Sequence, residues 1–150
     1  MRMFGAASEL ADAIGETFGP GSWLTVDQEM ISAFADLTGD RQWVHTDPDR
    51  AAREMPGGKT IAHGYLLLSL LGRLIPELYS VQARTVLNYG VDKLRLLAPV
   101  PSGARIRARV SPKACDAVSN GARVTCELAI EIEGLEKPAL IASYIFLYLD

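Results

Sequence analysis

The hydrophobic pattern of this 150-residue chain changes at about Gln82 from a helical period to a period of two, and it keeps the second period to the C-terminus. Turns at VPSG, at VSNG and around Gly134 divide this half into long antiparallel strands. The predicted strands occupy residues 84–100, 104–118, 122–134 and 137–150. Helices followed by strands predict an α+β domain in which the helices cover one face of an antiparallel sheet.

The first half carries helix signals. Ser8 is a candidate cap for a short helix over residues 9–14, and residues 22–26 form a brief strand candidate. Thr25 and Gln28 form a capping-box pattern, and Gly39 is a stop signal. The face of this helix that we expect to be buried holds Met30, Ala33, Phe34 and Leu37.

A central helix is expected from Ile61 or Ala62 to about Leu78, after a short helix over residues 49–54 that Asp47 and Pro48 open. The central segment carries almost no charge over its first three turns, which is typical of a helix surrounded by protein. One long apolar helix packed against a curved antiparallel sheet of about five strands is the geometry called a hotdog fold.

Length and composition favour one soluble domain over residues 1–150, because no linker or internal repeat interrupts the chain. A net charge of −3 gives no basic surface for nucleic acid. The most apolar run, residues 61–78, contains His63, Arg73 and Pro76 and is shorter than the roughly 20 apolar residues that span a bilayer. We therefore expect neither a nucleic-acid partner nor a membrane partner.

Cysteine usage and the N-terminus indicate a cytoplasmic protein. Cys115 and Cys126 lie outside any CxxC or metal-ligand spacing, so we expect reduced thiols. The first 15 residues lack an apolar region long enough for a signal peptide.

The segment FADLTGDRQWVHTDPDRA, residues 34–51, resembles the signature of the MaoC-like and (R)-specific enoyl-CoA hydratases. Two further landmarks of that family follow in order: IAHGYLLLSL at the start of the central helix, and LRLLAPVPSG. The DRQWVH and NYG forms resemble the NodN-like branch, in which Gln42 and Trp43 stand where many members have Asn and Pro. The signature positions that match are Phe34, Thr38, Gly39, Asp40, Val44 and His45.

The resemblance implies that Asp40 and His45 are catalytic. They are five residues apart, so on one continuous helix their side chains would point to different sides. Gly39 breaks the helix before them, and on a loop both side chains can reach one water. The family implies that convergence, and the two residues then share water activation and proton transfer, with the acid and base roles left open between them.

Gly64 is the candidate oxyanion donor. Its backbone N–H lies in the first turn of the central helix, where amide groups lack intrahelical partners and the helix dipole favours negative charge. The alternative is that Gly64 is small only to admit the sheet or the overlying loop. His63 beside it is interpreted as a structural histidine. Two histidines 18 residues apart match no common metal-ligand spacing, so no metal site is expected.

Trp43 and Asn88 are the remaining candidate substrate-binding residues. Trp43 is interpreted as a wedge between its loop and the body of the protein, with a place in the acyl pocket as the alternative. Asn88 is placed near the ligand, although Asn and Gly in one strand are also typical of a bulge.

The function implied by the resemblance is reversible hydration of a trans-2-enoyl thioester to the (R)-3-hydroxyacyl thioester, without a cofactor. The substrate is an acyl-CoA or acyl-carrier thioester, and the protein is expected to be a homodimer whose sheets join edge to edge. The alternatives are a hotdog thioesterase and a non-catalytic acyl-thioester-binding module. The thioesterase is disfavoured because the central helix has no acidic residue before Glu77.

Overall fold

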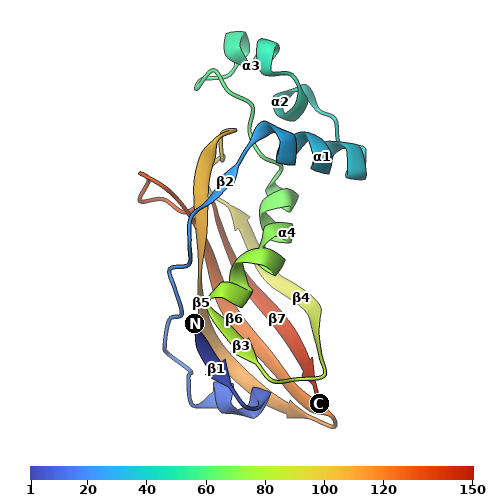
Figure 1. Cartoon of the computed structure of the whole chain (residues 1–150), viewed down its shortest axis with the longest axis vertical. Coiled ribbons are helices and arrows are strands. Elements are labelled where there is room, and N and C mark those ends of the chain that lie inside the picture. The colour runs from blue at the N-terminus through green and yellow to red at the C-terminus, as the bar shows by residue number, and fades with distance from the viewer.

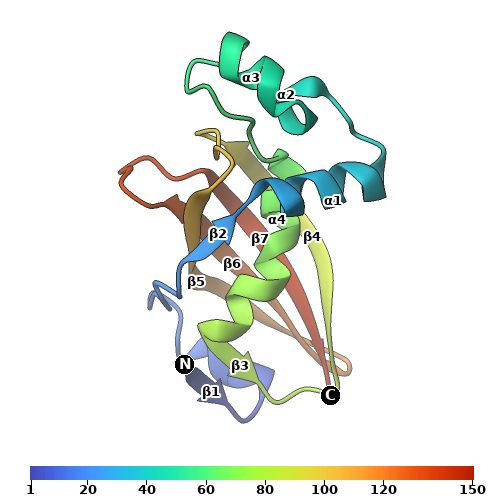
Figure 2. The same cartoon turned by 45° about the horizontal axis from the view of Figure 1, so that its top comes forward.

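A five-stranded antiparallel sheet is the largest element of the computed structural model, which describes residues 1–150 (Figures 1 and 2). Its strand order is β2-β5-β6-β7-β4. The strands are β2 (Leu24–Val26), β4 (Thr85–Leu96), β5 (Ala104–Val118), β6 (Gly121–Ile132) and β7 (Leu140–Leu149). The four long strands lie within or at the predicted ranges, except that β6 begins one residue earlier, which confirms the α+β prediction.

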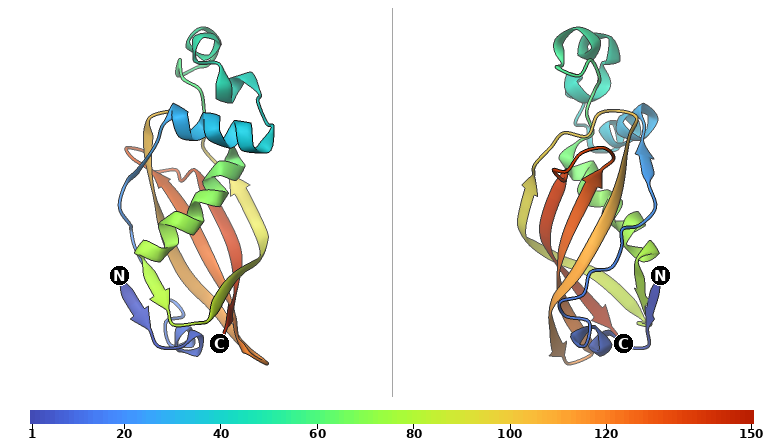
Figure 3. Two further views of the ribbon diagram at one scale, coloured as in Figure 1. Left: turned by 45° about the vertical axis from the view of Figure 1, so that its right-hand side comes forward. Right: turned by 90° about the vertical axis from the view of Figure 1, so that its left-hand side faces the viewer.

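Helix α4 (Gly64–Leu74) crosses one face of this sheet, and the sheet curves around it (Figure 3). A 3-10 turn, η2 (Ile75–Glu77), continues its direction. The helix starts later than predicted, because the two residues expected to open it pair with the segment before β5 instead. Ile61 forms a bridge with Pro101, and the Ala62 N–H donates to the Val100 carbonyl at 2.8 Å.

The prediction that protein surrounds the central helix is wrong for the single chain. One face of α4 packs into the core through buried leucines at 66, 67, 71 and 74. The other face is open, since Tyr65 is 69% exposed and Gly72, about two turns further along the same face, is also exposed. Low charge marked this helix correctly as central, but it did not show that one side lacks a cover within the chain.

Alternation along the strands separates the core from the outer face. On β6, residues 122, 124, 126, 128, 130 and 132 are buried toward α4. Ionic pairs cover the opposite face: Glu131 accepts from Arg107 at 2.6 Å and from Arg109 at 2.5 Å, and Arg105 pairs with Glu133. The period of two therefore places the apolar face against the helix and the charges in solvent.

Three short helices, α1 (Gln28–Thr38), α2 (Trp43–Thr46) and α3 (Pro48–Glu54), form a cap over one end of the sheet, as Figures 1 and 2 show. α1 ends at Gly39, where φ is +78°, and α3 starts at Asp47, whose side chain accepts from the Arg50 N–H at 2.9 Å. Both end signals are confirmed. Helix α2, which carries His45, was not predicted.

The start and the buried face of α1 differ from the predictions. The N-cap is Asp27, which accepts from the Met30 N–H at 2.9 Å, and not the Thr25–Gln28 capping box. Thr25 is held in β2 by its pairing with β5. Of the residues predicted to be buried, Met30 and Phe34 are partly buried against the core, whereas Ala33 and Leu37 are exposed. The fully buried residues are Ile31 and Ala35, because α1 lies over the end of the sheet and presents only a narrow stripe to it.

The opposite end of the molecule holds both termini and a small parallel sheet of β1 (Arg2–Phe4) and β3 (Tyr79–Val81) (Figure 1). The N-terminal helix is a 3-10 turn, η1 (Ala7–Ala11), whose N-cap is Ala6, so Ser8 is not the cap. Both cysteines are free thiols, and burial raises the pKa of Cys126 to about 12. None of the helices is long and apolar enough to cross a membrane.

Candidate active site

The candidate site lies where the cap meets the N-terminus of α4. Residues 40–45, from the end of α1 to α2, run alongside residues 60–63, which lead into α4. The two segments are joined in both directions: the Ile61 N–H donates to the Val44 carbonyl at 2.9 Å, and Nδ1 of His45 lies 2.7 Å from the Ile61 carbonyl. Positions that are widely separated in sequence are therefore held side by side.

His45 is the most firmly fixed residue of the site. It is 8% exposed, and its Nδ1 must carry a proton, since the Ile61 carbonyl can only accept. In the neutral form of the ring, Nε2 then has the free lone pair. The backbone carbonyl of His45 accepts from Nε2 of Gln28 at 2.7 Å. The side-chain oxygen of Gln28 in turn accepts from the hydroxyl of the buried Thr60. Gln28 and Thr60 are supporting residues that sequence reasoning missed.

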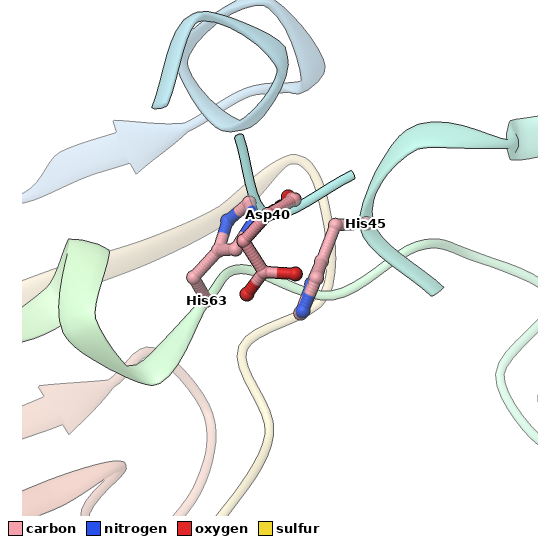
Figure 4. Close-up of side chains that lie close together, drawn as sticks. All are labelled: Asp40, His45 and His63. Atoms are coloured by element: carbon pink, nitrogen blue, oxygen red, sulfur yellow. Dashed lines mark hydrogen bonds between the residues drawn. The ribbon is translucent and has the colours of Figure 1, made fainter. Parts of the chain in front are cut away.

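Asp40 is exposed and directly follows the left-handed Gly39. Its side chain nevertheless gathers with both histidines, as Figure 4 shows. One carboxylate oxygen and one ring nitrogen from each of His45 and His63 lie within 4.8 Å of one another. The structure thus brings the predicted pair together, on a turn and a short helix that follows it.

His63 lies inside this cluster, which was not predicted. It is 3% exposed, its ring stacks on His45 with centroids 3.8 Å apart, and its Nε2 lies 2.9 Å from the Asp40 backbone carbonyl. The three side chains carry atoms that transition metals accept as ligands, although the sequence spacing did not suggest it. The Nε2–H of His63 is committed to the Asp40 carbonyl oxygen, and Nδ1 of the same ring has no hydrogen-bond partner.

Gly64 is the first residue of α4, directly beside this cluster. A Cβ at this position would lie 2.1 Å from Cδ1 of Leu96 on β4. Leu96 is 53% exposed, so its side chain has room to rotate into solvent. Close packing against Leu96 favours a glycine here, but a larger residue could be accommodated if the Leu96 side chain moved. Both interpretations of Gly64, as oxyanion donor and as a packing residue, therefore stay open.

Trp43 lies against α3, where the Arg50 guanidinium carbon is 4.1 Å from its ring centroid. This contact lies within the cap and not between the cap and the body of the protein, so the interpretation of Trp43 as a wedge stays a prediction. Asn88 lies elsewhere, in a groove of about 320 Å³ between β4, β7 and the C-terminal half of α4. A register shift separates Asn88 from Gly90, so the bulge is present.

The groove beside α4 begins well beyond Gly64. It is lined by Leu71, Gly72 and Ile75 on the helix side, which lie about 10–16 Å from Gly64 at 1.5 Å per residue. Across it, the hydroxyls of Tyr79 and Tyr148 are 2.9 Å apart, and burial raises the pKa of Tyr148 to about 12. The groove is therefore apolar and aromatic, with uncharged hydroxyls at neutral pH.

A larger cavity of about 510 Å³ lies on the outer face of the sheet. Charged and hydroxyl side chains line it, among them Lys93, Arg95 and Arg109, and it contains none of the predicted site residues. The Asp40–His45 cluster is thus separate from this cavity.

The fold and the site place this protein in the class of hotdog-fold proteins that have an Asp and a His gathered over the start of the central helix. Comparison with known proteins gives the family. The sequence model described as "MaoC like domain" matches residues 9–131. The chain therefore belongs to the MaoC-like family, as the sequence motifs predicted.

Relatives support this assignment over the whole chain. The chain is 45% identical to 3-hydroxyacyl-thioester dehydratase Z of Mycobacterium tuberculosis over 150 residues, which is 99% of each protein. It is 41% identical to nodulation protein N of Rhizobium leguminosarum biovar viciae, covering 92% of this chain and 88% of that one. The likeness to the NodN branch is thereby confirmed, and the name of the first relative agrees with the predicted enzyme class, a hydro-lyase.

A solved structure supports the fold independently. The monoamine oxidase regulatory protein of Archaeoglobus superposes with a TM-score of 0.80 at 30% identity, covering 99% of this chain and 97% of that one. The agreement extends over the cap, the central helix and the sheet.

Proposed function

We propose that this protein is a hydro-lyase that reversibly adds water to trans-2-enoyl thioesters and forms the (R)-3-hydroxyacyl thioester. The observation that carries the proposal is the approach of the Asp40 carboxylate and His45 to within 4.8 Å, beside the first amide of α4. Hydrogen bonds to a water are about 2.8 Å long, so one water can bridge two atoms at this separation.

The proposed chemistry gives separate roles to His45, Asp40 and the Gly64 N–H. His45 in its Nδ1–H form has a lone pair on Nε2 that accepts a proton from the water, while Asp40 holds that water. The water oxygen forms its bond to C3, and the pair returns a proton to C2, so atoms and charge balance. Negative charge develops on the thioester oxygen, for which the Gly64 N–H at the helix N-terminus is the proposed donor.

The alternatives have less support. A thioesterase needs a carboxylate on or near the central helix, but Glu77 lies beyond its far end, where it accepts from the Ser22 N–H at 3.3 Å. A non-catalytic binding module would have no use for a histidine whose tautomer leaves a lone pair free beside a carboxylate. CoA and an acyl carrier both fit the proposal as the thioester carrier.

The predicted pair is tested with crotonyl-CoA. We expect loss of the enoyl absorbance without release of free thiol, and we expect Asp40→Asn and His45→Gln each to lower kcat at least about 10²-fold. Asp36→Asn is the matched control, because this exposed carboxylate on α1 pairs with Arg41 outside the cluster. Folding is checked by circular dichroism.

Each other outcome has a meaning. Near-wild-type turnover in both variants would contradict the assignment of Asp40 and His45. Release of free thiol would identify a thioesterase. Absence of both signals across a series of enoyl chain lengths would favour the binding module.

The role of Gly64 is tested by adding one methyl group. Gly64→Ala should cost no more than about 1–2 kcal/mol in the free energy of unfolding, because only the half-exposed Leu96 must move. It should lower kcat/KM roughly 10²-fold by crowding the thioester oxygen. Gly64→Ala combined with Leu96→Ala should restore stability in urea unfolding and leave activity low, whereas recovered activity would assign Gly64 to packing alone.

We further propose that the groove of about 320 Å³ beside α4 receives the acyl tail. Gly72 is exposed on its wall, and no atom lies within 4 Å of a Cβ built there. Gly72→Leu should therefore fold, occupy part of the groove, and lower kcat/KM for long enoyl-CoA substrates at least about tenfold relative to crotonyl-CoA. Arg73→Leu, whose position does not line the groove, is the control, and an unchanged chain-length profile would exclude this path.

We also propose a homodimer joined through β4. This strand is twelve residues long, pairs only with β7, and leaves Leu87 45% and Tyr89 61% exposed, so its free edge can pair with a second copy. Tyr89→Lys should shift the sedimentation mass from two chains toward one. Leu135→Lys, at an equally exposed position in the turn between β6 and β7, should leave it at two. A wild-type mass of one chain contradicts the proposal.

A further inference from the structure

His63 is enclosed by aromatic rings that come from two different helices. Its ring lies 5.0 Å from that of Phe34 on α1 and 3.8 Å from that of His45 on α2, where the rings are 24° from parallel. Only 3% of its surface is exposed. His63 itself precedes α4, so this one ring joins the cap to the start of the central helix.

The two ring nitrogens of His63 are in unequal surroundings. Nε2 lies 2.9 Å from the backbone carbonyl of Asp40, and because a carbonyl can only accept, Nε2 carries the proton. Nδ1 is buried and has no hydrogen-bond partner. A buried polar atom without a partner destabilises the folded state, and an apolar side chain here would avoid that cost.

Asp40 has few other attachments. It is exposed, it follows a left-handed glycine, and residues 39–42 belong to no helix or strand. Its N–H donates to the Thr38 hydroxyl at 3.3 Å, a contact within its own turn. The bond from His63 is therefore the hydrogen bond that ties Asp40 to the body of the protein.

We propose that His63 is a positioning residue that holds Asp40 and His45 in their catalytic arrangement. It donates from Nε2 to the Asp40 main chain and supports the His45 ring by stacking. The proposal rests on the proposed function of that pair. Side chains 18 and 23 residues away in sequence are set relative to each other by one ring, and the unpartnered Nδ1 is the cost of keeping its donor.

Two variants separate the donor from bulk packing. His63→Phe keeps an aromatic ring for the stack and removes both the donor and the unpartnered nitrogen. We expect its melting temperature to be unchanged or higher, and its kcat for crotonyl-CoA to fall roughly ten- to hundredfold with KM changed less than about threefold, since misplacement of catalytic groups affects mainly the chemical step. His63→Gln keeps an N–H donor near the position of Nε2 and should retain several times more activity than His63→Phe.

The expected order of kcat is wild type, then Gln, then Phe, without the same order in melting temperature. A Phe variant with kcat within about twofold of wild type overturns the proposal, because proper positioning affects rates by far more. The proposal is also overturned if melting temperature and kcat fall together in both variants, because that result indicates a structural role alone.

An NMR measurement makes the test independent of turnover. In wild type, ring nitrogen shifts should assign His63 to the Nε2–H tautomer, and in His63→Phe the amide signals of residues 39–42 should shift or broaden while those of β6 stay in place. If wild type hydrates no enoyl thioester but these signals behave as expected, the proposed function fails and the positioning role stands. Unmoved signals for residues 39–42 overturn the positioning role whatever the activity.

Discussion

The pairing of residues 40–45 with residues 60–63 is the interaction on which the site depends. The Ile61 N–H and carbonyl bond to Val44 and to the His45 ring, and these contacts lie where the chain enters the central helix. They satisfy buried polar groups and fix the tautomer of His45 at the same time. The hydrogen bonds of Ile61 that stabilise the loop are thus also the ones that fix the orientation and tautomer of His45, the proposed base.

The two ends of the central helix have different proposed functions, catalysis at the N-terminus and binding of the acyl tail at the C-terminal half. Its N-terminus meets the cap, where Asp40, His45 and Gly64 come together and the helix dipole favours negative charge. Its C-terminal half lines an apolar groove about 10–16 Å away, with Tyr79 and Tyr148 across it. A rigid rod of this length can therefore hold the reacting carbons and a long tail at fixed separation.

Polar atoms at this site are placed for geometry at some expense in stability. Thr60, His45 and His63 are the buried polar residues of the chain, and all three belong to the network around the cap. The Thr60 hydroxyl donates to Gln28 and Nδ1 of His45 to the Ile61 carbonyl, while Nδ1 of His63 has no partner. Elsewhere the interior is apolar apart from the paired hydroxyls of Tyr79 and Tyr148, so most departures from simple core packing lie at the proposed reaction centre.

The sequence by itself determined the long strands, the end of α1 at Gly39 and the start of α3 at Asp47, because periodicity and end signals act over a few residues. It also indicated Asp40 and His45 through their motif. Only the tertiary structure decided which side of α1 is buried, that Gln28 supports His45, and that His63 joins the site. These contacts link residues 16 to 32 positions apart, and their partners are set by how the cap packs on the sheet, which no local pattern encodes.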